Sequence, residues 1–392
     1  MVEAMLDRTP TRDRLVALAP QLAELAAGQT TESETDRRVG PEVIRSLLDA
    51  GFARYFVPTD RGGDAATAGF GELLDAVVTV GEACPSTAWV ASLTASLGRM
   101  AAFLPADGQA ELWADGPDAL IVGALMPLGR AEPVGSGDGW RLAGRWPFVS
   151  AIEHSDWALV CGMAATGGAD GNGDGAPEAR FFAVPRSAYE IEDTWFNVGM
   201  RATGSNTLVL DETVVPAARS FSRDDLAAGR AEGSPAACHT VPLRAANGLA
   251  FATPVLGAAR GALRSWTGYV ATKASRPGLS APSGDRATHE LTLARASGEI
   301  DAAELLLRRA AAVADQGAVT PPDIARNTRD CALAVDLLVT AVDRLFRTAG
   351  TTGQSATNAL QRFWRDVNVA ATHVVLKFEA ASTAYAQHHL VP

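Results

Sequence analysis

The chain has 392 residues, of which 47% are hydrophobic and 20% charged, and its formal net charge is −11. This length exceeds what one simple core needs, so we expect two or three domains in a globular protein. The acidic balance argues against nucleic acid or an anionic membrane as the main partner. The apolar runs are shorter than the roughly 18 residues of a membrane-spanning helix, and the first residues lack the apolar centre of a signal peptide.

The first part of the chain, from residue 11 to about 115, has the apolar spacing of helices. DRLVALAPQLAELAA carries one apolar stripe, and PEVIRSLLDAGF begins with the proline of a first helical turn and ends at Gly51. After the loop TDRGGDAATAG, the stretches FGELLDAVVTVGEA and TAWVASLTASLGRMAAFL predict two more helices. We therefore expect an N-terminal helical domain over residues 1–118.

The pattern changes from about residue 119 to 220. Short runs rich in Val, Leu and aromatic residues, bounded by Gly, Pro and Asp, are typical of strands and turns. They are ALIVGALMP, GWRLAGRWPFVSA, DWALVCGMAA, ARFFAVP and NTLVLDETVVP. GGADGNGDGAPEA, residues 167 to 179, predicts a flexible hairpin loop. This part predicts a small antiparallel barrel or sandwich over residues 119–225.

From about residue 243 the helical pattern returns. Four amphipathic segments can form a bundle, which we place in a domain over residues 226–392. They are AANGLAFATPVLGAARGALRSWTGYVATK, HELTLARASGEIDAAELLLRRAAAVA, RDCALAVDLLVTAVDRLFRTA and QRFWRDVNVAATHVV. The predicted fold class is α+β, mostly α: a helical domain, a central β-barrel and a C-terminal four-helix bundle.

The cysteines and histidines indicate no metal site. Cys84, Cys161, Cys238 and Cys331 lie far apart and form no C-x-x-C pair, which favours reduced thiols in a cytoplasmic protein. The chain also lacks H-E-x-x-H, a phosphate-binding G-x-x-x-x-G-K-[ST] loop and a G-x-S-x-G elbow.

Four stretches, read in chain order, share a family pattern. They are AGFARYFVPTDRGG (50–63), GRWPFVS (144–150), NVGMRATGSNTLVLDETVVP (197–216) and RFWRDVNVAATH (362–373). Together they resemble the acyl-CoA dehydrogenase superfamily over nearly the whole chain. S-T-A-W-V (86–90), T-G-S (203–205) and the histidines after GRWPFVS and after R-D look closest to the group D flavin-dependent monooxygenases, a two-component branch of hydroxylases and N-oxygenases. That group usually has glycine after the serine of GRWPFVS, and this chain has Ala151.

The resemblance implies that GRWPFVS faces the flavin ring. Phe148 and Val149 would form an apolar wall that excludes water, and Ser150 would bond N5 as a catalytic residue. Met126 and Trp195 would also lie near the ring. A serine that only closes a strand is the plain alternative.

The phosphate end of the flavin needs cations or a closely approaching backbone. The resemblance implies Arg276 in TKASRPG, and Gly350 and Gly353 in TAGTTGQ. In this family the second loop often serves the flavin of a neighbouring subunit. A tetramer is the usual assembly of the family, and the long apolar faces of the bundle suit one, so a homotetramer is expected. Ordinary loops between helices are the alternative.

Trp89, His154 and Met200 are expected at the substrate pocket by the same resemblance. If residues 146 to 154 form one strand, Ser150 and His154 share a face. Core packing is the alternative for Trp89 and Met200, and an exposed strand end for His154.

His373 lies off the apolar stripe of the helix predicted over 361–375. Dehydrogenases of the superfamily often carry a glutamate base on this segment, whereas here the next carboxylate is Glu379. A neutral imidazole can take a proton from a phenol or amine, so we expect His373 to be a catalytic base. Asp366 is two turns away, about 10 Å along the axis, too far to orient the imidazole directly. A structural histidine is the alternative.

The resemblance implies a monooxygenase that hydroxylates a small aromatic or polyketide-like molecule with O2 and reduced FMN or FAD, through a C4a-hydroperoxyflavin. The chain has no G-x-G-x-x-G nicotinamide fingerprint, so a separate NAD(P)H flavin reductase is the expected partner. Three alternatives stay open: N-oxygenation of an amino sugar, an acyl-CoA dehydrogenase with Glu299 or Glu304 as base, and a scaffold that has lost its flavin.

Overall fold

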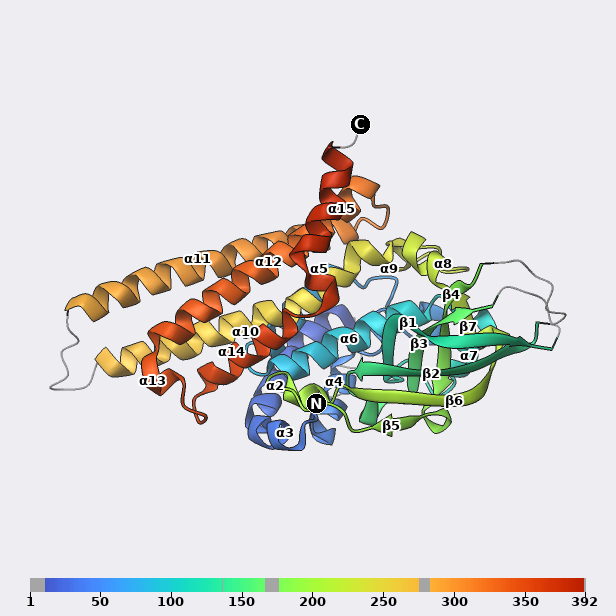
Figure 1. Ribbon diagram of the computed structural model, residues 1–392, viewed down its shortest axis with the longest axis horizontal. Coiled ribbons are helices and arrows are strands. Elements are labelled where there is room, and N and C mark those ends of the chain that lie inside the picture. The colour runs from blue at the N-terminus through green and yellow to red at the C-terminus, as the bar shows by residue number, and fades with distance from the viewer. Residues whose placement is uncertain (1–10, 136, 166–175, 275–282, 391–392) are drawn as a thin grey trace.

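The computed structural model describes residues 11–135, 137–165, 176–274 and 283–390 (Figure 1). Helices come first in the chain, a sheet follows, and long helices complete it. In Figure 1 the sheet lies at one end of the molecule and the far ends of the long helices lie at the other. The predicted class, α+β and mostly α, is confirmed.

The N-terminal part is helical, as predicted. Its helices are α2 (Thr11–Gly28), α3 (Thr30–Asp36), α4 (Pro41–Ala50), α5 (Phe70–Gly81), α6 (Pro85–Ala101) and α7 (Ala106–Leu112). Gly51 ends α4 with a φ of 97°, a conformation that glycine adopts without strain. Helix α6 is buried along almost its whole length, because it packs against β1 on one side and against the bundle helix α10 (Leu243–Ala274) on the other.

The strands form one seven-stranded sheet in the order β5-β6-β2-β1-β3-β4-β7. They are β1 (Ile121–Val134), β2 (Gly139–Val149), β3 (Trp157–Ala164), β4 (Glu178–Pro185), β5 (Glu190–Glu192), β6 (Asn206–Pro216) and β7 (Ser220–Ser222). The expected antiparallel arrangement is wrong at one place, since β1 and β3 are parallel. The reason is that the chain turns after β2 and crosses to the other edge of β1 before β3 begins. Most of the predicted hairpin loop 167–179 lies outside the described residues.

The Trp146 side chain lies in the hydrophobic core at the sheet. It is fully buried, and its Nε1–H donates to the carbonyl of Cys161 at 2.7 Å. Gly129 and Gly144 leave room for its ring, since a Cβ at these positions would lie 2.2 Å and 2.7 Å from it. Close packing of this kind holds in place the strand that Ser150 directly follows.

The C-terminal part is the expected helical bundle. Two short helices, α8 (Arg223–Ala228) and α9 (Ala237–Thr240), lead into α10, α11 (Ser283–Ala314), α12 (Pro321–Thr348), α13 (Gly350–Gly353), α14 (Ala359–Ala370) and α15 (Phe378–Leu390). The prediction of one helix through residue 375 is wrong, because α14 ends at Ala370 and His373 is extended, with a ψ of 135°. Thr372 bonds back to the carbonyl of Val369, and β-branched residues at 372, 374 and 375 disfavour a continued helix.

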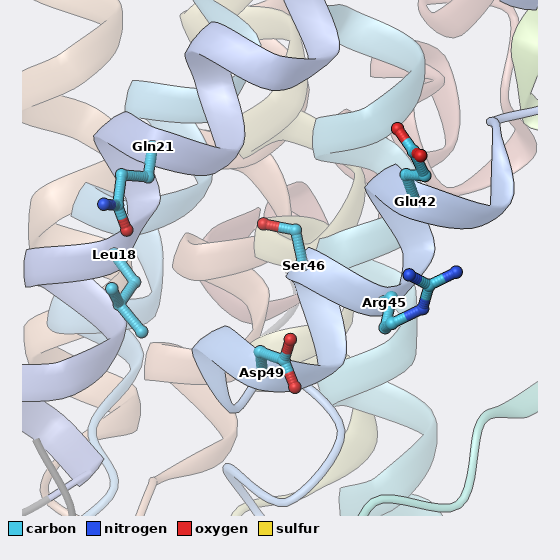
Figure 2. A pocket seen from close by; sticks show the side chains of 6 residues that line it. All are labelled: Leu18, Gln21, Glu42, Arg45, Ser46 and Asp49. Carbon is cyan, nitrogen blue, oxygen red and sulfur yellow. The ribbon is translucent and has the colours of Figure 1, made fainter. Parts of the chain in front are cut away.

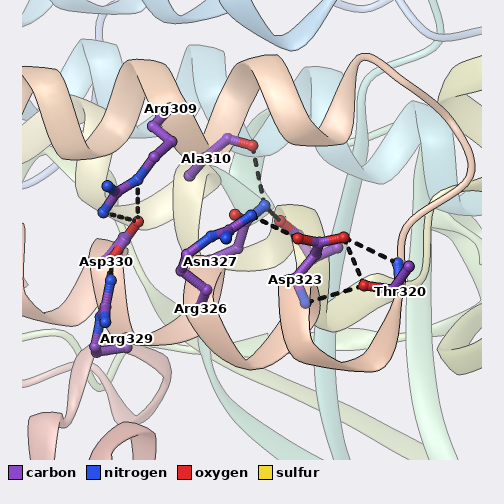
Figure 3. Close-up of polar contacts among 9 residues, drawn as sticks. Arg309, Ala310, Thr320, Asp323, Arg326, Asn327, Arg329 and Asp330 are labelled. Carbon is purple, nitrogen blue, oxygen red and sulfur yellow. Dashed lines mark hydrogen bonds and ion pairs between the residues drawn. The ribbon is translucent and has the colours of Figure 1, made fainter. Parts of the chain in front are cut away.

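Buried polar contacts join the bundle helices (Figure 3). Asp330 of α12 is fully buried and pairs with Arg309 of α11 at 2.6 Å and with Arg329 at 2.5 Å. Asn327 donates to the carbonyls of Ala245 on α10 and Ala310 on α11, both at 3.0 Å. These contacts tie together the helices on which the site is built. Within the described ranges, we find no helix apolar and long enough to cross a membrane.

Candidate active site

Trp89 is the residue at which the predicted site comes together. From α6, its indole Nε1–H donates to the Ser150 hydroxyl at 3.2 Å. Its ring meets the His373 imidazole edge to face, with ring centres 5.8 Å apart. Three predicted site residues from distant parts of the chain are therefore neighbours.

Phe251 of α10 completes this group, and sequence reasoning missed it. Its ring stacks on His373 with centres 3.8 Å apart and planes 21° apart, and it lies 5.2 Å from the Trp89 ring. One long apolar helix offers many aromatic and aliphatic side chains, and nothing in its sequence marks which one faces His373.

The surroundings of His373 define its protonation. Burial lowers the pKa of the imidazole to about 4, so the ring is neutral at pH 7. Its Nδ1 accepts the backbone N–H of Val375 at 3.3 Å. A neutral imidazole has one N–H and one lone pair, so the proton is on Nε2. The free ring nitrogen is thus a hydrogen-bond donor, whereas the expected base would need a lone pair there.

A row of hydroxyl groups leads from Ser150 into the protein. The Ser150 Oγ lies 2.8 Å from the Ser205 Oγ, which lies 2.6 Å from the Thr203 Oγ1. Thr203 then donates to the carbonyl of Met200 at 2.8 Å. Ser150 is half-buried, and the other three residues are buried, so the row opens only at Ser150.

The backbone turns sharply after Ser150. Strand β2 ends at Val149, Ala151 has a φ of 57°, and a short 3-10 helix spans Ile152–His154. The expected strand through His154 is therefore wrong. His154 Nε2 lies 2.9 Å from the carbonyl of Val39, and burial lowers the pKa of this imidazole. The structure gives His154 no bond or ring contact with Trp89, Ser150 or His373, and its assignment to the substrate pocket has no support from this geometry.

An apolar surface lies beside the hydroxyl row. Phe148 is 70% exposed although its φ is 67°, a conformation that costs a non-glycine residue free energy. Its ring is 6.2 Å from that of Trp195, whose Nε1–H donates to the carbonyl of Met200 at 2.9 Å. Met126 of β1 is 55% exposed. Val149 differs from the expectation, because its side chain is fully buried in the core and presents nothing to an outer wall.

Asp366 holds the backbone of Met200 in place through a hydrogen bond. This carboxylate on α14 is 2% exposed and accepts the backbone N–H of Met200 at 2.6 Å. Burial, with a smaller contribution from the charge of Glu34, raises the pKa of Asp366 to about 7, against the opposing effects of the Met200 N–H bond and of Arg365. Sequence reasoning considered Asp366 only as a partner of His373 and missed this contact.

Of the residues expected at the phosphate end, only the two glycines can be placed. Arg276 is outside the described residues. Gly350 has a φ of 63°, and a Cβ on Gly353 would lie 2.3 Å from that of Ala349, so both positions need glycine for local reasons. Figure 1 shows α13, which they delimit, at the end of the molecule opposite the sheet. Within one copy of the chain this loop does not meet Ser150.

The carboxylates considered for a dehydrogenase base are already paired. Glu299 pairs with Arg344 at 2.7 Å. Glu304 pairs with Arg308 at 2.8 Å and with Arg260. Both therefore serve the packing of α10, α11 and α12.

A hollow lies between α2 and α4, away from these residues (Figure 2). It is lined by Leu18, Gln21, Glu42, Arg45, Ser46 and Asp49. These side chains are mostly exposed, and none of the predicted site residues is among them. Among the described residues, no three His, Cys, Asp or Glu side chains gather as a metal site.

Comparisons with known proteins agree with this geometry. The family model "Acyl-CoA dehydrogenase, C-terminal domain" matches residues 249–378. The oxygenase component of an FADH2-dependent resorcinol hydroxylase from Rhizobium sp. (strain MTP-10005) is 31% identical, over 98% of this chain and 95% of the relative. The crystal structure of the HsaA monooxygenase from M. tuberculosis superposes with a TM-score of 0.88 at 27% identity, covering 97% of this chain and 99% of that one. XiaF from Streptomyces sp., solved with FADH2 and glycerol, gives a TM-score of 0.87 at 28% identity, covering 99% of this chain and 97% of that one.

Proposed function

This chain belongs to the FADH2-dependent oxygenase components, flavin-dependent monooxygenases with the acyl-CoA dehydrogenase fold, and from that premise we propose that it hydroxylates a small aromatic substrate. The proposal includes reduced FMN or FAD as cofactor, O2 as co-substrate and a separate NAD(P)H flavin reductase as the source of reduced flavin. The observation that carries it is the contact of Trp89 with both the Ser150 hydroxyl and the His373 imidazole.

The residues at the sheet fit a flavin ring. A large apolar side chain kept in a strained conformation and exposed to solvent is a mark of a binding surface, and Phe148 has both properties. Met126 adds apolar area, and the half-buried Ser150 hydroxyl adds one polar contact. A mostly apolar wall with few polar groups suits a planar heteroaromatic ring.

A neighbouring copy of the chain is part of this proposal. Gly350 and Gly353 lie too far along the molecule to serve a flavin beside Ser150 of the same copy, as Figure 1 illustrates. A symmetric assembly brings such a loop to the site of another copy. The exposed Leu291 and Leu305 of α11 offer apolar area for the contact, which supports the expected homotetramer.

Each residue of the site has a task in this proposal. Bound reduced flavin supplies the electrons and the O2 activation that oxygen transfer requires. Phe148 and Met126 cover one side of the ring site, and Ser150 positions the polar edge. Trp89 and Phe251 form an aromatic wall that suits a flat aromatic substrate. His373 donates its Nε2–H to an oxygen at the reacting centre and, being neutral, does so without adding charge.

Other parts of the proposal have less specific support. A cytoplasmic location fits the four free and buried cysteines. Two of the relatives named above are a hydroxylase oxygenase component and a monooxygenase, which favours hydroxylation over dehydrogenation. The pairing of Glu299 and Glu304 points the same way. None of these relatives is named as an N-oxygenase of an amino sugar.

The test supplies chemically reduced FMN or FAD, 18O2 and a panel of phenols that includes resorcinol, then measures 18O in the product by mass spectrometry. We expect one 18O atom per hydroxylated product and hydrogen peroxide from uncoupled turnover. The proposal fails if no phenol gains 18O and the protein instead purifies with oxidised FAD that an acyl-CoA reduces.

A further inference from the structure

The hydroxyl row that starts at Ser150 ends on a group that can only accept. Trp89 Nε1–H points at the Ser150 Oγ, and the Met200 carbonyl lies 2.8 Å from the Thr203 Oγ1. An indole N–H only donates and a carbonyl only accepts, so both ends of the row have a fixed direction. Each hydroxyl between them has a single proton to give.

Counting protons fixes every bond of the row. Thr203 gives its proton to Met200, so in the 2.6 Å contact with Ser205 the donor is Ser205. The proton of Ser205 is then used, so in the 2.8 Å contact with Ser150 the donor is Ser150. Ser150 accepts from Trp89 with one lone pair. The Ser150 oxygen is then left with one unused lone pair and no proton to donate outward.

We propose that Ser205 and Thr203 are positioning residues that make Ser150 a hydrogen-bond acceptor and thereby select reduced flavin over oxidised flavin. This inference rests on the proposed function. Reduced flavin carries a hydrogen on N5 and can donate it to Ser150. Oxidised flavin has only a lone pair on N5, which would face the lone pair of Ser150.

The protein around the row resists a reversal. If the row reversed, so that Thr203 donated to Ser205 and Ser205 to Ser150, the Thr203 Oγ1 and the Met200 carbonyl oxygen would face each other at 2.8 Å without a proton between them. Ser205, Thr203 and Met200 are 4%, 2% and 3% exposed, so solvent water does not reach them to replace a lost hydrogen bond. The Met200 carbonyl is itself fixed, because Asp366 accepts the N–H of the same residue at 2.6 Å. The selection therefore comes from groups that do not touch the flavin.

The test measures dissociation constants of oxidised FAD and FMN, and of the dithionite-reduced forms, by anaerobic equilibrium dialysis. In the unaltered protein we expect the reduced form to bind more tightly. Ser205→Ala removes the acceptor of the Ser150 proton, and Thr203→Val removes the acceptor of the Ser205 proton while keeping the side-chain shape. Both substitutions free the Ser150 proton to bond N5 of oxidised flavin. The dissociation constant of oxidised flavin divided by that of reduced flavin should therefore fall about tenfold, mainly because oxidised flavin binds more tightly.

Two further variants separate this from a loss of structure. Ser205→Thr keeps a hydroxyl and should keep the ratio. Ser155→Ala removes a buried hydroxyl of the same part of the chain that bonds Tyr189 instead, and should also keep it. An unchanged ratio in both Ser205→Ala and Thr203→Val overturns the inference and leaves flavin binding intact. Failure of the unaltered protein to bind either form of either flavin overturns the proposed function as well.

Discussion

The imidazole of His373 lies face to face with the ring of Phe251, their centres 3.8 Å apart and their planes 21° apart. This contact removes water from one face of the imidazole, which is the physical reason that burial lowers its pKa to about 4. Among the described residues, the backbone partner of the ring is the Val375 N–H on Nδ1. The neutral ring with its proton on Nε2 is therefore a property of how α10 packs against the segment after α14.

Replacing His373 tests its role directly. We expect His373→Ala to lower the hydroxylated product formed per reduced flavin by about 10- to 100-fold, because a donor at the reacting centre is lost. Flavin affinity should stay nearly unchanged. The measurement is product against hydrogen peroxide at fixed reduced flavin. Thr372→Ala, at an exposed neighbour, is the matched control. Unchanged coupling in His373→Ala would remove this residue from the mechanism.

The stacking of Phe251 can be tested without turnover. Phe251→Leu opens one face of the imidazole to water, so the pKa of His373 should rise by about one unit toward its ordinary value of 6.5. The shift is followed by NMR titration of the ring protons of His373. Phe103→Leu, at a buried ring that packs near Phe221 instead of His373, serves as control. An unchanged pKa of His373 would mean that groups other than Phe251 exclude water from the imidazole.

Asp366 gives stability a pH dependence of known sign. Its pKa is raised from 3.8 to about 7, so the folded chain retains a proton that the unfolded chain has lost between these values. The stabilisation is full below pH 3.8 and is lost as the pH rises through 7. Asp366→Asn can still accept the Met200 N–H but does not titrate. The unaltered protein therefore loses stability between pH 5 and pH 8, and the variant does not lose it through this group. The difference between the two free energies of unfolding, variant minus unaltered, should rise by about 3 kcal/mol over that range. Urea titrations at both pH values check this, and an equal difference at the two would contradict it.

Ala151 occupies a backbone conformation that favours glycine. With a φ of 57°, an alanine there costs about 1 kcal/mol relative to glycine. We expect Ala151→Gly to raise the free energy of unfolding by up to about that amount, measured by urea titration. A fall would show that packing of the buried methyl group outweighs the backbone strain.

The ion pairs of Asp330 support the bundle rather than the site. Asp330→Asn leaves Arg309 and Arg329 with weaker, uncharged contacts, and should lower the free energy of unfolding by about 2 kcal/mol. Flavin dissociation constants should stay as they are. Asp323→Asn, which alters an exposed cap at the start of the same helix, gives the scale for a surface change. An altered flavin affinity in Asp330→Asn would mean that the bundle and the site are coupled.

The fold was predictable because it depends on local patterns. Apolar spacing predicted α2, α4, α5 and α6, and Gly51 marked a helix end. The motifs brought Trp89, Ser150 and His373 into one site, since each motif carries its own residue. The parts that failed depend on geometry between distant segments or on rare backbone states.

His154 illustrates the second kind of failure. A positive φ is uncommon in a residue other than glycine, so the sequence did not predict the turn at Ala151. Because of this turn, His154 lies beside the carbonyl of Val39. The parallel pairing of β1 and β3 follows from the same turn. Ser205 and Thr203 stood in a recognised motif, but the direction of their hydrogen bonds depends on the Met200 carbonyl and on Trp89, which only coordinates place beside them.

The double contact of Trp89 has a practical meaning for redesign. Exchanging this indole changes the hydrogen bond to Ser150 and the aromatic contact with His373 in one step, so gains in one are offset by losses in the other. Phe251 contacts the rings of Trp89 and His373, and the structure gives it no bond to the Ser150 hydroxyl. Directed evolution toward bulkier phenols should therefore randomise position 251 and leave position 89 fixed.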